Sequence, residues 1–374
     1  MRKTIFGVIL LFSSAAIFAL PPVLTTAQSG LGAMLNRVLD TPTARTVIWY
    51  SAPGDLKRLL QVSVTSAADI ESLPPAQRIQ YLLEYGQQVY YSPYSGVQDP
   101  VTWAQSFGLN PFTIEYEVTI GAEAADQYAI IQMGTTFDAN GMGGALSGLG
   151  YQPVNIAGQN VFAFGGDGDT SSGFAAQLTG GRYNRVLLNG REVFAASTTA
   201  ALNAALNGRG AISSDPSYAA LATALMGSSA APDAVLLSAV LYGGNWLSDE
   251  ALPQALAASG LSADRLGITN SLPAYGAAGI GYSWTSSGRL LTVAAVYDDG
   301  NAASAAASAL VERLNVYRSL NEPLRTVFAG WGFSANVIQA NGKAVAVVTA
   351  LVPEQTDVAW VTLAQMQDIV FLLP

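Results

Sequence analysis

The sequence predicts an α+β protein built from two related modules, each an antiparallel sheet of hairpins with helices packed on one sheet face. Two stretches, residues 114–151 and 280–317, repeat one order of predicted elements. Each is followed by a hairpin centred on Asn-Gly, at 189–190 and 341–342, and then by a helical pattern. The order hairpin, helix, hairpin, helix is typical of a ferredoxin-like fold or a similar open-sheet sandwich.

The elements ahead of the first repeat are of both kinds. Residues 31–40 predict a short helix, and 46–52 predict a strand. Residues 74–89 predict a longer helix with Pro at its start. Each repeat then gives a strand, a turn, a strand ending in an aromatic residue and Asp, and a helix of small residues. Small side chains allow such a helix to lie close on a sheet, so we expect both helices to cover one.

The Asn-Gly dipeptides are the strongest local hairpin signal, because both central residues of a type I′ turn need positive φ. Residues 153–164 predict a further hairpin between the first helix and the first Asn-Gly turn. Residues 226–234 are small and include a proline, which indicates a linker. We therefore divide the chain into a first module at 28–229 and a second at 230–374.

The N-terminal segment predicts export from the cytoplasm. Arg2 and Lys3 precede an uncharged stretch at 4–20, and small residues up to Ala27 offer a cleavage point. Residues 1–27 are thus a signal peptide, or alternatively a retained membrane anchor through 4–20. Either alternative places the remainder in the periplasm, outside the cell, or on the outer face of the cytoplasmic membrane.

The composition excludes several chemistries. The chain has no Cys and no His, which removes thiolate nucleophiles, Ser-His-Asp triads, iron–sulfur clusters and most zinc sites. The net charge is −9 and no Lys/Arg run follows a phosphate backbone, so we expect no nucleic-acid partner. No sequence feature implies a cofactor.

Aspartates stand where a strand passes into each repeated helix. Asp138 in the first repeat corresponds to Asp298 in the second, and an Asp at this position accepts hydrogen bonds from free helix N–H groups. Asp299 has no acidic counterpart, since Ala139 stands there. We predict that Asp138 and Asp298 are helix caps rather than metal ligands.

The loop at 164–173 holds the candidate metal ligands. Asp167, Asp169 and Ser171 alternate as the first ligands of a calcium loop do, on a Gly-rich backbone. Ser172 and Leu178 occupy the places where an EF-hand needs Gly and Glu. The alternatives are an exposed loop without metal and a calcium site of another kind.

Aromatic residues are dense between 81 and 116, and their helical spacing predicts core packing for most of them. Tyr90, Tyr91 and Tyr94 lie instead beside Pro and Ser, which favours an exposed loop. We predict that these three tyrosines form an interaction patch for a protein partner at the membrane or cell surface.

Two further charged groups have alternative interpretations. Arg182, Arg185 and Arg191 surround the first Asn-Gly turn, where they would bind an anion or pair with local acids. Glu115 and Glu117 alternate along one predicted strand, which places both on one face. Such a face would suit either a carboxylate-based hydrolase or ordinary solvent exposure.

The absence of Cys and His, together with the export signal, favours an exported, non-catalytic bacterial envelope protein. We expect a binding or scaffold role, as an accessory subunit of a membrane-associated assembly. The alternatives are an extracytoplasmic binding protein for a sugar, lipid or other small molecule, and a carboxylate-based hydrolase.

Overall fold

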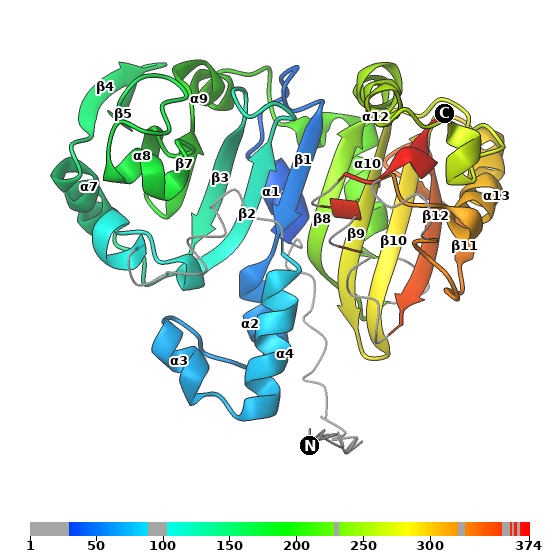
Figure 1. The fold of residues 1–374 in the computed structure, drawn as a ribbon, viewed down its shortest axis with the longest axis horizontal. Helices are drawn as coiled ribbons and strands as arrows, with labels where there is room; N and C mark the ends of the chain where they lie inside the picture. The colour runs from blue at the N-terminus through cyan, green and yellow to red at the C-terminus, as the bar shows by residue number, and fades with distance from the viewer. Residues whose placement is uncertain are drawn as a thin grey trace, which may run out of the picture.

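The computed structural model describes residues 30–88, 103–227, 232–320, 326–353, 360, 363–364 and 367–374. Their strands form one antiparallel sheet of 12 strands (Figure 1). In spatial order the strands are β11 (Ser334–Ala340), β12 (Lys343–Val352), β10 (Gly288–Tyr297), β9 (Ala277–Thr285), β8 (Val235–Gly243), β1 (Val47–Ser51), β2 (Ile114–Ile120), β3 (Tyr128–Met133), β7 (Glu192–Ala196), β6 (Arg185–Asn189), β5 (Gln159–Ala163) and β4 (Gln152–Ile156). The prediction of a mixed α+β protein is confirmed, with a large antiparallel sheet and helices.

The sheet has a similar strand succession on both sides of its middle, except that β5 and β4 extend only the N-terminal half. β1 and β8 lie antiparallel at the centre, with Trp49 opposite Val240. Outward from β1 come β2, β3, β7 and β6, and outward from β8 come β9, β10, β12 and β11. An approximate two-fold axis through the β1–β8 junction would produce this arrangement.

Helices cover both faces of the sheet, whereas the sequence analysis predicted one. On the first face lie α7 (Ala139–Gly148), α8 (Phe174–Thr179), α12 (Leu252–Ser259) and α13 (Gly300–Val316). The core on this face is extended at one end of β1 by α2 (Pro53–Leu60), α3 (Ala67–Ser72) and α4 (Pro75–Gly86). On the second lie α1 (Gly30–Leu35), α9 (Thr199–Leu206) and α10 (Pro216–Met226). The reason is visible in β8 and β10, whose almost continuous apolar runs are buried on both sides rather than alternating.

The second Asn-Gly turn has the predicted geometry. Asn341 and Gly342 have φ values of 49° and 75°, as a type I′ turn requires. The first differs, because Asn189 pairs with Glu192 and the two-residue loop is Gly190-Arg191. Gly190 has a φ of 60° and Arg191 has no positive φ, so this turn is of the II′ kind.

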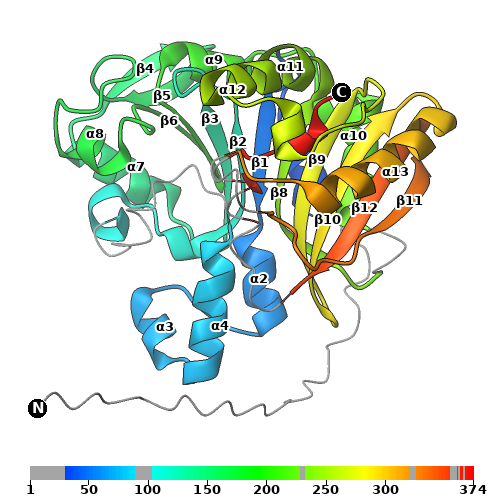
Figure 2. The same cartoon turned by 45° about the vertical axis from the view of Figure 1, so that its right-hand side comes forward.

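Helices lie at both ends of the central strands β1 and β8 (Figures 1 and 2). α2, α3 and α4 lie together at one end of β1 (Figures 1 and 2). α11 (Gly244–Trp246) follows β8 directly and lies at the opposite end (Figure 2). α10, which precedes the predicted division at 229/230 in the sequence, packs on strands β8 to β12 of the C-terminal half. The division itself stays a prediction.

No helix among the described residues has the length and apolar character needed to span a membrane. Residues 1–27, for which a signal peptide or anchor is predicted, lie outside the described residues.

Candidate functional site

A cavity of about 780 Å³ lies where the chain leaves the central strand β1 and enters α2. Its walls come from α1, α2, the ends of β2 and β3, and the start of β8. Its polar lining includes Tyr50, Asp55, Arg58, Glu115 and Tyr116. We call this the central cavity.

Arg58 holds the polar groups of the central cavity together. Its guanidinium donates to Glu115 Oε2 at 2.6 Å, to Asp55 Oδ1 at 2.7 Å and to Tyr116 Oη at 2.8 Å. A Cβ on Gly54 would lie 2.1 Å from Glu115 Oε2, so glycine is needed there for α2 to approach β2. The network therefore depends on close packing of α2 against the strand.

Burial makes the carboxyl group of Asp55 a weaker acid than usual. It raises the pKa of this carboxyl above its ordinary value, against the opposing effect of Arg58. Because the native pKa is raised, Asp55 contributes stability below its unfolded pKa, and this contribution is lost as the pH rises through the native pKa. Burial likewise raises the pKa of Tyr116 to about 12, so its hydroxyl stays protonated. Perturbed groups of this kind gather at functional sites.

Tyr50 is the buried polar group that the fold leaves unsatisfied in the central cavity. Its side chain is 1% exposed, and its hydroxyl forms no hydrogen bond within the described part of the chain. The ring stacks on that of Tyr116, with centroids 6.4 Å apart. A Cβ on Gly30 would lie 2.4 Å from the Tyr50 hydroxyl oxygen. A buried hydroxyl without a partner costs about 1–3 kcal/mol, which a bound molecule would recover.

The lining of the central cavity also includes apolar side chains. Met133, Val235 and Leu236 contribute from the end of β3 and the start of β8. Arg37 and Arg191 add two further guanidinium groups to the lining. Arg37 pairs with Glu192, whereas Arg191 forms no ion pair with any residue that the structure describes. The cavity is therefore amphipathic, with guanidinium groups in excess of carboxylates.

Glu115 and Glu117 do not share a face, in contrast to the prediction. The register of β2 shifts between Ile114 and Tyr116, and this irregularity turns Glu115 toward the central cavity. Glu117 is 1% exposed and lies opposite Ile131, within the other face. A bulge adds one residue to a strand and so breaks the alternation on which the prediction depended.

The predicted helix caps meet different outcomes. Asp138 stands at the N-cap position of α7, but its side chain accepts no helix N–H hydrogen bond. The cap of α13 is Asp299, which accepts from the N–H groups of Asn301 and Ala302, and not Asp298. Asp298 pairs with Lys343 instead. The helix begins one residue later than the repeat suggested.

Asp299→Ala is expected to lower the free energy of unfolding by about 1 kcal/mol, because two helix N–H groups lose their acceptor. Asp298→Ala removes an ion pair whose aspartate is 88% exposed and should change it by less than about 0.5 kcal/mol. Urea denaturation followed by circular dichroism measures both. An equal or larger loss for Asp298→Ala would contradict the assignment of the cap.

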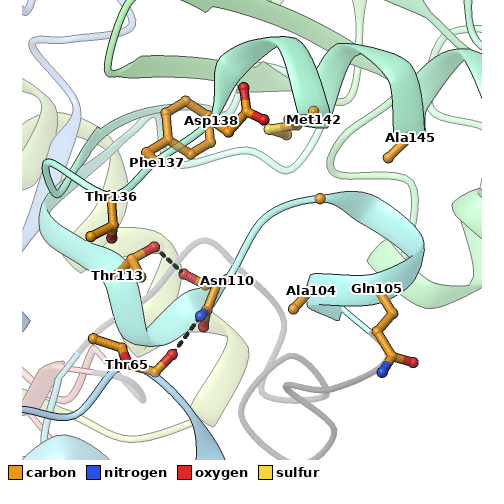
Figure 3. A pocket seen from close by; sticks show the side chains of 12 residues that line it. Thr65, Ala104, Gln105, Asn110, Thr113, Thr136, Phe137, Asp138, Met142 and Ala145 are labelled. Carbon is orange, nitrogen blue, oxygen red and sulfur yellow. Dashed lines mark hydrogen bonds between the residues drawn. The ribbon is translucent and has the colours of Figure 1, made fainter.

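A further cavity, of about 530 Å³, lies beside the first turn of α7 and includes Asp138 (Figure 3). The side chain of Asn110 donates to the carbonyl of Thr65 at 2.5 Å, and the Thr113 hydroxyl donates to the carbonyl of Asn110 at 2.8 Å. The first bond joins the loop at 110–113 to the segment before α3, and the second lies within that loop. Among the described residues, no buried side-chain polar atom without a hydrogen-bond partner lines this cavity, so we do not place the functional site there.

The calcium candidates are engaged separately in the loop at 164–173. Asp167 pairs with Arg185 at 2.7 Å and also accepts from Thr199. Asp169 Oδ1 accepts from the N–H groups of Ser171 and Ser172, and hydrogen bonds with Ser172 lower its pKa. Asp167 therefore links Arg185 to Thr199, whereas Asp169 accepts hydrogen bonds from its own turn.

The remaining predicted groups are dispersed. Tyr90, Tyr91 and Tyr94 lie outside the described residues. Arg185 is buried against Asp167, and Arg191 lines the central cavity, so the predicted arginine group does not act as one site. Asp55 and Arg58 were not among the predicted site residues. The sequence feature that could have indicated them is the group of charged residues directly after the predicted strand at 46–52.

No protein-family model, curated protein or solved structure matches this chain.

Proposed function

We propose that this chain is an exported, non-catalytic envelope protein of two related modules, and that it binds a small molecule in the central cavity. The observation that carries the proposal is the hydroxyl of Tyr50, which is buried on the wall of a cavity of about 780 Å³ without a hydrogen-bond partner among the described residues. This volume is typical of sites for small organic ligands. Export through the segment at 1–27 remains part of the proposal.

The lining favours a small organic anion with an apolar body. Arg37, Arg58 and Arg191 face two carboxylates, and Arg191 alone forms no ion pair with a described residue. An anionic head at Arg191 would leave the Tyr50 hydroxyl within the polar half, while Val235 and Leu236 would contact the apolar body. Charged hydrogen bonds from a guanidinium are stronger than neutral ones and would orient such a ligand.

The same contacts favour binding over hydrolysis. Carboxylate-based hydrolysis requires one carboxylic acid and one carboxylate free to act on the substrate. Glu115 accepts from Arg58 at 2.6 Å and lies 3.9 Å from Lys57 Nζ, while Asp55 shares the same guanidinium. Both acids are thus engaged with cations of the protein.

The two-module proposal is supported by the strand order. The stretches at 114–151 and 280–317 supply β2, β3 and α7 in one half and β9, β10 and α13 in the other. Both sets occupy the same place relative to the central strands. We therefore interpret the chain as two copies of one arrangement joined edge to edge.

A scaffold role is the second candidate, and one observation favours it. Ile79, Leu82 and Leu83 on α4 are 58%, 47% and 53% exposed, and their spacing places them on one helix face. α4 packs on α2, which lines the central cavity together with Gly30, the first described residue. A protein partner at this face would lie near the point where a membrane-anchored N-terminal segment enters the fold.

Tyr50→Phe is expected to weaken the binding of octanoate to the full chain about fivefold to tenfold, measured by isothermal titration calorimetry. The loss of one buried hydrogen bond corresponds to about 1 kcal/mol or slightly more. The unliganded variant should be as stable as the parent or more stable, because the unsatisfied hydroxyl is gone. Weaker binding together with unchanged or higher stability is expected only if the Tyr50 hydroxyl contacts the ligand.

The matched control is Tyr242→Phe. Tyr242 is also fully buried with a hydroxyl that lacks a partner among the described residues, but it does not line the central cavity. Octanoate binding should be unchanged by this variant. Native mass spectrometry of protein from its host should show a bound small molecule. A partner protein lost upon Leu83→Ser, with no bound small molecule, would favour the scaffold role instead.

A further inference from the structure

A third cavity, of about 510 Å³, lies at the end of the central strands opposite to the central cavity. The central cavity opens where β1 passes into α2, and this one opens where β8 passes into α11. It is lined by the residues before β1, the first turn of α10 and the segment Gly243 to Trp246. We call it the distal cavity. None of its residues lines the central cavity.

Three glycines shape the distal cavity. A Cβ on Gly243 would lie 1.9 Å from the carbonyl oxygen of Arg45, and one on Gly244 would lie 1.9 Å from that of Tyr275. A Cβ on Gly276 would lie 2.7 Å from Ser217 Oγ. At Gly243 and Gly244 the backbone segments therefore approach more closely than a side chain would allow.

The charge of the distal cavity is negative. The only guanidinium in its lining, that of Arg45, is already bound by Asp40 at 2.7 Å and by Asp215 at 2.9 Å. Asp249 and Glu250 also line the cavity, and neither forms an ion pair with any residue in the described part of the chain. Two carboxylates are thus left without a cation.

A second observation, independent of the acids, also points to a ligand. Tyr218 is 1% exposed and lines the cavity, yet its hydroxyl forms no hydrogen bond with the described residues. Burial raises its pKa well above the ordinary value, so the neutral hydroxyl remains able to accept an N–H bond. Trp246 adds an aromatic ring, stacked on Tyr242 with an interplanar angle of 8°.

We propose that the distal cavity binds a small organic cation through a primary ammonium group. Asp249 and Glu250 supply the charge, the Tyr218 hydroxyl accepts one N–H, and the ring of Trp246 contacts the cation or its alkyl chain. An organic cation fits better than a metal ion. Among the described residues, no group of three or more Asp or Glu side chains could hold a metal. The inference uses no residue of the proposed function and stands apart from it.

The test is calorimetric titration of the full chain with putrescine at low ionic strength. We expect saturable binding at one site, weakened at least about tenfold in the double variant Asp249→Asn/Glu250→Gln. Tyr218→Phe should weaken binding severalfold without lowering the melting temperature. The control variant Glu71→Gln/Asp264→Asn removes two exposed charges elsewhere and should bind as the parent does.

Three results would overturn the proposal. Putrescine would fail to bind at millimolar concentrations, or it would bind equally well to the Asp249→Asn/Glu250→Gln variant. Alternatively, the control variant would lose as much affinity as that variant, which would indicate general attraction of cations to an acidic protein. Tetramethylammonium lacks N–H donors, so we expect it to bind more weakly than putrescine, and equal affinity would contradict the role of Tyr218.

Discussion

Gly243→Ala is expected to lower the free energy of unfolding by about 3 kcal/mol or more, or to prevent folding. The new Cβ would lie 1.9 Å from the carbonyl oxygen of Arg45. That atom belongs to the backbone just before β1, so it cannot move aside as a flexible side chain would. Relief requires separating β8 from β1, where Gly243 donates its N–H to the carbonyl of Thr46.

The measurement is urea denaturation of the purified variant, followed by tryptophan fluorescence and circular dichroism. Gly86→Ala serves as the control, since a Cβ there meets no atom within 4 Å and Gly86 ends helix α4. This change should leave stability unaltered or raise it by up to about 1 kcal/mol. If Gly243→Ala were as stable as the parent, the close approach of β8 to β1 would be wrong.

Asp368→Ala should be the second large loss, about 3 kcal/mol. Asp368 is fully buried and accepts hydrogen bonds from the Tyr317 hydroxyl, the Ser319 hydroxyl at 2.6 Å and the Leu320 N–H at 2.9 Å. Its removal takes an acceptor away from each of these donors, and a buried donor that is left unsatisfied costs about 1–3 kcal/mol before relaxation. The C-terminal segment would keep the bonds from Arg313 of α13 to the carbonyls of Phe371 and Leu373.

Thermal and urea unfolding of Asp368→Ala measure this effect, with Asp126→Ala as an exposed control expected within about 0.5 kcal/mol of the parent. Asp368→Asn separates charge from shape. It keeps one acceptor oxygen and should lose less than the alanine variant. A loss of less than about 1 kcal/mol in Asp368→Ala would show that the C-terminal segment is held mainly by its apolar contacts.

The sequence predicted those parts of the fold that depend on neighbouring residues. The mixed α+β class and the turn at Asn341-Gly342 followed from local chemistry. The single sheet did not, because it depends on β1, a five-residue strand that pairs with β8 far along the chain. Nothing within residues 47–51 indicates that partner. The second layer of helices was not predicted for the same reason, because it also forms through contacts between residues that are far apart in the sequence.

The candidate site was largely missed, for two physical reasons. Asp55 and Arg58 become notable only when β2 brings Glu115 and Tyr116 against α2, and this contact joins segments about sixty residues apart. The importance of Tyr50 lies in the burial of its hydroxyl without a hydrogen-bond partner in the described part of the chain, which no pattern of residue types reveals. Charges directly after a strand were a usable signal. The cap of α13 was predicted at Asp298, one residue too early, because the alignment of two repeats matches whole elements and does not fix the exact residue at which a helix begins.

The β1–β8 junction also sets how the two halves depend on each other. A chain cut between α9 and α10 would leave β1 on one fragment and β8 on the other, each with an unpaired edge. Every residue of β1 is buried, so neither fragment could expose this edge to water without loss. The fragments would therefore tend to reassociate, or to pair with copies of themselves, since both edges accept the same kind of antiparallel partner. A half with one unpaired strand at its edge would thus have the means of forming a homodimer.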